Sequence, residues 1–101
     1  MWELAEDVAR TLIKREPENI MHVVALAEVM GNREGPVAAA AVYEFAIDRF
    51  PDFALLRVSL AVELIKAGQL DDAKRVLKLA VQQDPQLRAV ILDHPSLDSI
   101  W

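Results

Sequence analysis

Three prolines recur in this chain at a constant interval. Pro17, Pro51 and Pro85 each lie 34 residues from the next, and each follows an apolar helical pattern. The apolar residues between them repeat at the same interval, in the pairs Leu26 and Leu60, Ala27 and Ala61, Ala39 and Ala73, Tyr43 and Leu77, and Ala46 and Ala80. A period of this length indicates stacked copies of one supersecondary unit, because a single copy cannot bury its own apolar face.

Each period contains the pattern of two amphipathic helices. Apolar side chains recur at three- and four-residue spacing, and turn-forming residues separate the runs. We expect helices over residues 2–15, 20–30, 36–49, 55–66, 71–83 and 87–92. Asn19 is placed to cap the second of these and Pro36 to begin the third, while Gly31 and Gly68 are predicted to end the helices that precede them.

The pattern resembles the tetratricopeptide repeat family, whose unit of about 34 residues carries Trp-x2-Leu-Gly-x2-Tyr, then Ala-x3-Phe, then Pro. The matching residues are Leu26, Ala27, Met30, Ala39, Tyr43 and Pro51 in one unit, and Leu60, Ala61, Leu64, Ala73, Leu77 and Pro85 in the next. The chain departs from the family at Val23 and Arg57, which replace Trp, and at Ala27 and Ala61, which replace Gly. The resemblance implies an all-α superhelix of antiparallel helix pairs stacked right-handedly, with about six to seven helices.

The same register divides the chain as a single domain over residues 1–101. Residues 1–17 form an N-terminal half-unit, residues 18–51 and 52–85 are two full repeats, and residues 86–101 form closing helices. In the last segment Pro95 interrupts the first-helix pattern, and Ser96 is placed to cap a short final turn that carries Leu97, Ile100 and Trp101.

Composition excludes several classes of partner. The chain has 16 acidic and 11 basic residues, a formal charge of −5, and no cysteine. A nucleic-acid binder needs a basic face for phosphate contacts, so neither nucleic acid nor an acidic membrane surface is an expected partner. No apolar run approaches the roughly 18 residues of a membrane span, and no signal peptide is recognisable, so we expect a cytoplasmic protein.

The residues do not form the pattern of an enzyme. His22 and His94 are the only imidazoles, and no glycine-rich elbow or phosphate loop accompanies the few hydroxyl groups. A pairing of His22 with Glu18 supplies too few ligands for a metal, so we interpret His22 as a surface residue. We therefore expect no catalytic residue, no metal site and no cofactor.

The resemblance implies a binding groove instead. In the family the first helices of successive units line a concave surface, and the corresponding residues here are Met21, Val24, Glu28, Leu55, Val58, Val62, Ile65, Lys66 and Leu92. This lining is mainly apolar and lacks the Lys and Asn residues with which some family members hold acidic C-termini. We expect a protein–protein interaction scaffold that binds an apolar or amphipathic peptide or helix.

Three alternatives remain for the apolar stripe. The chain's own terminal segments fill it, or it is additional core, or the protein is a structural element that self-associates as a homodimer or larger homo-oligomer. A two-repeat array lies near the size minimum of about three repeats for solenoid stability, which favours association. The chain also fits the terminal piece of a longer array attached to an enzyme.

Overall fold

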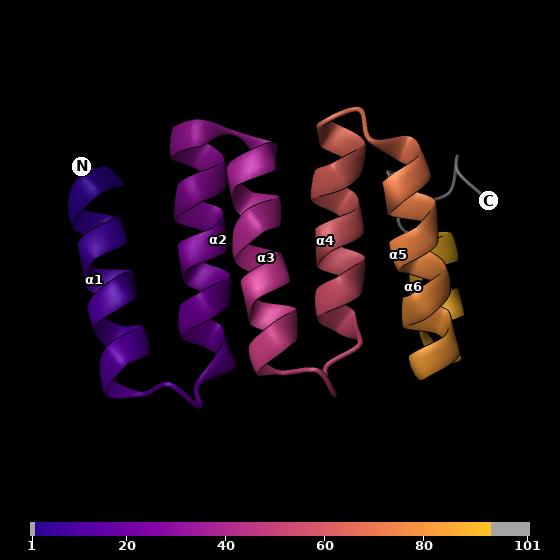
Figure 1. The fold of residues 1–101 in the computed structure, drawn as a ribbon, viewed down its shortest axis with the longest axis horizontal. Helices are drawn as coiled ribbons and strands as arrows, with labels where there is room; N and C mark the ends of the chain where they lie inside the picture. Colours follow the sequence, from indigo (N-terminus) through magenta and orange to yellow (C-terminus); the bar gives the residue numbers. More distant parts are fainter. Residues whose placement is uncertain (1, 94–101) are drawn as a thin grey trace.

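The computed structural model describes residues 2–93, which form a row of six antiparallel helices. They are α1 (Trp2–Arg15), α2 (Ile20–Glu34), α3 (Pro36–Arg49), α4 (Leu55–Lys66), α5 (Leu70–Gln83) and α6 (Leu87–Asp93). Each helix packs against the next one in the chain, and α6 lies behind α5 (Figure 1). The predicted final turn over residues 96–101 lies outside the described residues. The predicted all-α helical repeat is confirmed.

The second helix of each unit keeps the 34-residue period in its boundaries. The helices α1, α3 and α5 begin at Trp2, Pro36 and Leu70 and end at Arg15, Arg49 and Gln83. The first helix α1 therefore has the place of a second helix, as its sequence register predicts. It continues the row beside α2 and does not fold across the other helices (Figure 1).

The predicted helix starts at Asn19 and Pro36 are confirmed. The Asn19 side chain accepts a hydrogen bond from the Met21 backbone N–H at 3.0 Å, and Pro36 is the first residue of α3. The predicted helix end at Gly31 is wrong, because α2 continues to Glu34 and the turn is made by Gly35 at a φ of 96°. Positive φ favours glycine, so Gly35 is the residue suited to this turn.

The core is a continuous apolar cluster between the two layers of the helix row. The family-motif positions of α3 and α5 have side chains at most 9% exposed, and they are Ala39, Tyr43, Ala46, Ala73, Leu77 and Ala80. Within the described residues no charged side chain is buried. Burial of these apolar groups is the main stabilising term, at about 25 cal/mol per Å² removed from water.

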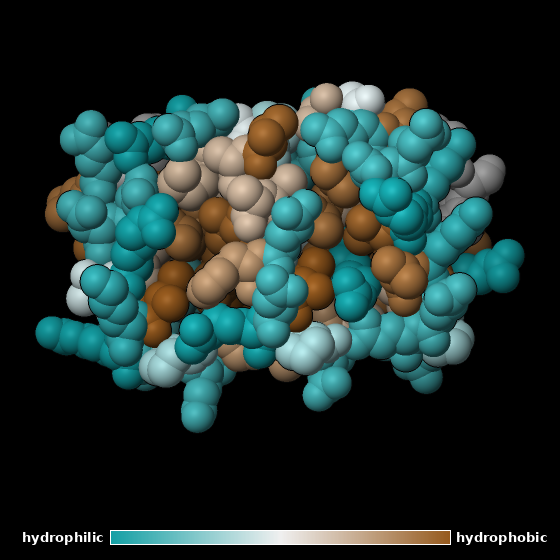
Figure 2. Space-filling model, in the orientation of Figure 1, coloured by the Kyte–Doolittle hydropathy of each residue, from teal (hydrophilic) through white to brown (hydrophobic). Residues whose placement is uncertain are grey.

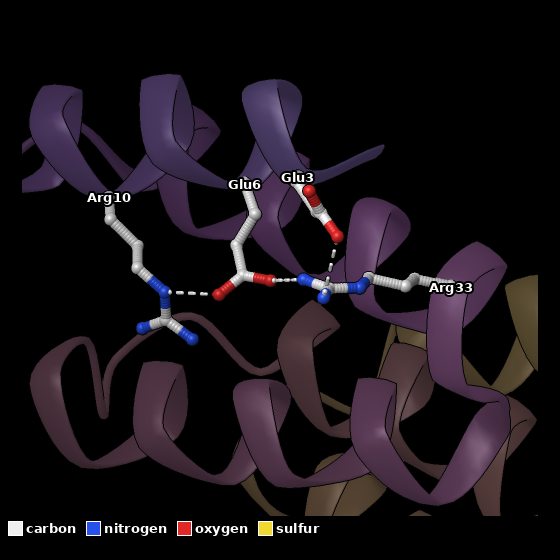
Figure 3. A network of polar contacts seen from close by, with 4 residues as sticks. All are labelled: Glu3, Glu6, Arg10 and Arg33. Atoms are coloured by element: carbon white, nitrogen blue, oxygen red, sulfur yellow. Dashed lines mark hydrogen bonds and ion pairs between the residues drawn. The ribbon is translucent and has the colours of Figure 1, made fainter. Parts of the chain in front are cut away.

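A polar cluster joins α1 to the end of α2 (Figure 3). Arg33 on α2 donates to Glu6 on α1 at 2.5 Å and lies 3.7 Å from Glu3, while Arg10 donates to the other Glu6 oxygen at 2.8 Å. The hydrogen bond from Arg10, supported by Arg33, lowers the pKa of Glu6 below its ordinary range. Two cations thus hold one carboxylate in its charged form at the junction of the helices.

Candidate protein-interaction surfaces

Large apolar side chains project from the first helices of the row. Met21 on α2, Leu55 on α4 and Leu92 on α6 are 64%, 55% and 49% exposed. Met21 and Leu55 lie 34 residues apart and so have equivalent places in successive units. We call the surface of α2, α4 and α6 that carries the predicted groove residues the first-helix face.

The remaining apolar residues predicted for this face are more enclosed. Val24, Val62 and Ile65 are half-buried and pack against the core cluster. Val58 is only 4% exposed and belongs to the core itself. The prediction that Val58 lines an open groove therefore needs correction, because α4 packs between α3 and α5 and the cluster of these helices encloses this side chain.

Charged groups border the apolar residues of the first-helix face. Glu28 and Lys66 are exposed, and the Lys66 ammonium lies 3.5 Å from the Glu63 carboxylate. Burial raises the pKa of the Tyr43 phenol, and the negative charges of Glu63 and Glu28 raise it further. The phenol of Tyr43 thus lies in an electronegative environment, with one carboxylate on α2 and another on α4.

A second apolar surface is a hollow of about 600 Å³ between α1 and α3, with α2 beneath it. Its lining comprises Arg10, Ile13, Lys14, Leu26, Met30, Ala38, Ala41, Val42 and Phe45. Our groove prediction, which considered first helices only, missed this surface. The available signal was the alanine run at residues 38–41, since small side chains on a helix leave room for a neighbour.

Hydrophobic surface is also visible in the space-filling view. Figure 2, in the orientation of Figure 1, shows hydrophobic side chains across the middle of the visible face and hydrophilic ones around its borders. An apolar patch with a polar rim is typical of a protein-interaction site.

The potential metal ligand His22 has a different partner from the one considered in the sequence. Its Nε2 lies 2.7 Å from a Glu16 oxygen, and its side chain is 17% exposed. Across residues 2–93 no three His, Asp or Glu side chains are grouped so as to hold a metal ion. His94 lies outside this range. None of the helices in the same range is long and apolar enough to cross a bilayer.

The repeat architecture agrees with a comparison against protein-family models. The model described as Tetratricopeptide repeat matches residues 36–91, which is more than half of the chain and spans α3, α4, α5 and most of α6. The chain belongs to the tetratricopeptide repeat (TPR) family. TPR units mediate protein–protein interactions, and their fold is an interaction fold. No curated protein and no solved structure shows significant similarity to this TPR chain.

Proposed function

We propose that this TPR chain binds an apolar or amphipathic peptide or helix on its first-helix face. The observation that carries the proposal is the exposure of Met21 and Leu55 at equivalent places of two successive units. Full burial of such a side chain is worth about 1.5–3 kcal/mol, so a partner that covers both gains a substantial part of its binding free energy there. The half-buried Val24 and Val62 on the same helices extend the apolar contact.

The charges on this face favour a partner with a basic border. Glu28 and Glu63 contribute negative charge beside Tyr43, and Lys66 lies next to only one of them. An amphipathic helix with an apolar stripe and a flanking Lys or Arg complements this arrangement. Complementary charge of this kind increases the association rate and selects the orientation of the partner.

The proposal can be tested by selecting ligands for the purified chain from a displayed library of amphipathic peptides. The affinity of a selected peptide is then measured by titration calorimetry for the wild type and for Leu55→Glu. We expect this substitution to weaken binding about tenfold or more, because it places a charge at the centre of an apolar contact. The matched control is Leu79→Glu on α5, which changes a leucine of similar exposure, 47%, on a second helix.

Two results would reject the first-helix face as the binding site. The first is equal weakening by Leu55→Glu and Leu79→Glu. The second is weakening by Ala41→Glu alone, since Ala41 lines the hollow between α1 and α3. Circular dichroism of each variant checks that the helices are intact before the affinities are compared.

A further inference from the structure

The face of α1 directed away from α3 is an open apolar surface. Leu4 and Val8 on this helix are 70% and 50% exposed. A hollow of about 440 Å³ lies beside them, lined by Leu4, Ala5, Val8, Ala9, Leu12, Ala25 and Val29. The first five belong to α1 and the last two to α2, so the surface spans two helices.

The internal repeat indicates what such a surface contacts. Residues 34 and 68 positions after Ala5, Ala9 and Leu12 are the motif residues of α3 and α5, namely Ala39, Tyr43, Ala46, Ala73, Leu77 and Ala80. In α3 and α5 these positions are at most 9% exposed. In α1, Ala5 and Leu12 remain half-exposed. This face of α1 therefore has the register of a helix-packing surface.

Charge along α1 indicates which helix fits it. The acidic residues Glu3, Glu6 and Asp7 lie in the first half of α1, and the basic residues Arg10, Lys14 and Arg15 lie in the second half. A parallel pair of such helices would bring like charges together. An antiparallel pair brings each acidic half against a basic half, and opposite charges across an interface stabilise that orientation.

The positions of two charges make this argument specific. Glu6 is already bonded to Arg10 and Arg33 within the chain. Asp7 and Lys14 are seven residues apart, so they lie on the same side of the Leu4 and Val8 stripe. In an antiparallel pair that centres on this stripe, Asp7 of each copy lies near Lys14 of the other, and the two-fold axis produces this pairing twice.

We propose that two copies of this chain associate through α1, packed antiparallel about a two-fold axis, with Leu4 and Val8 at the centre of the interface. The occupant of the open α1 face is thus a second copy of the same helix. This interface is separate from the proposed peptide site, because Met21 and Leu55 lie on the first-helix face. Each dimer would present two first-helix faces.

The oligomeric state of the full 101-residue chain tests this inference. Analytical ultracentrifugation over a range of concentrations is expected to give a concentration-dependent dimer. Val8→Glu should weaken the dimer about tenfold or more, because it places two like charges beside an apolar interface. Val37→Glu is the matched control, since Val37 is 62% exposed on α3 and does not line the α1 face. Leu55→Glu should also leave the dimer intact.

A charge exchange tests the antiparallel arrangement. Asp7→Lys should weaken the dimer, because it faces Lys14 of the other copy, and the double variant Asp7→Lys with Lys14→Asp should restore it. A wild-type monomer at all concentrations overturns the proposal, as does a dimer that Val8→Glu leaves unchanged. A monomer that binds a synthetic peptide of residues 20–34 on this face assigns the surface to a first helix and also overturns it. Failure of the double variant to restore the dimer overturns the antiparallel arrangement.

Discussion

Gly31 in α2 lies directly against Ala39 in α3. A Cβ atom at position 31 would be only 3.3 Å from the Ala39 Cβ, which is closer than most such contacts in proteins. Both residues lie within helices, and Gly31 has no turn to make. The glycine therefore serves the close approach of the two helices, at some cost in helix propensity.

Replacing Gly31 by leucine is expected to destabilise the protein. Overpacking a close contact costs about 1–3 kcal/mol, and the better helix propensity of leucine offsets at most about 1 kcal/mol of this. Urea unfolding followed by circular dichroism measures the change. The exposed neighbour in Asn32→Leu should alter stability by no more than about 0.5 kcal/mol. Equal stability of the wild type and Gly31→Leu would show that the helix contact does not depend on the glycine.

Burial separates two apolar positions of α4 that the sequence placed together. Val58→Glu should reduce the free energy of unfolding by about 3 kcal/mol or more, because it leaves a carboxylate in the core without a partner. Leu55→Glu should change it by about 0.5 kcal/mol at most, since Leu55 is 55% exposed and Val58 only 4%. Thermal melts of the two variants provide the comparison. Similar melting temperatures would contradict the burial of Val58.

The two leucines of α5 at positions 77 and 79 should respond very differently to truncation. Leu77 is fully buried, and Leu77→Ala is expected to cost about 2–5 kcal/mol through lost burial and a cavity. Leu79 is 47% exposed, and Leu79→Ala should cost less than about 1 kcal/mol. Chemical unfolding midpoints at equal slope measure both. A larger loss for Leu79→Ala would place the wrong face of α5 in the core.

Stability should decrease at acidic pH partly through Glu6. Its pKa in the folded state is lowered from the ordinary value of about 4.5, mainly by the hydrogen bond from Arg10 and also by Arg33. The native state therefore favours the charged form, and this contribution is present above about pH 4.5 and is lost as pH falls through the lowered pKa. Urea midpoints measured between neutral and acidic pH should vary less for Glu6→Gln. The same pH dependence in both proteins would exclude this role.

The pattern of residues was sufficient to predict the repeat fold. A period of 34 residues with apolar side chains at helical spacing leaves few ways to bury the apolar faces, and Asn19 and Pro36 begin helices through local chemistry that needs no tertiary context. The end of α2 was not predictable in this way. Gly31 and Gly35 both allow a helix to end, and only the packing of α2 against Ala39 distinguishes their roles.

The sequence by itself determined the helix pairs, their period and the apolar residues of the first helices. Tertiary structure decided which of those residues reach solvent. Leu55 and Val58 belong to one apolar run, but Leu55 is exposed and Val58 is enclosed by the cluster that α3, α4 and α5 form. The physical reason is that helical periodicity gives the direction of a side chain around its own axis, whereas burial also depends on how closely neighbouring helices approach. The hollow between α1 and α3 became visible for the same reason.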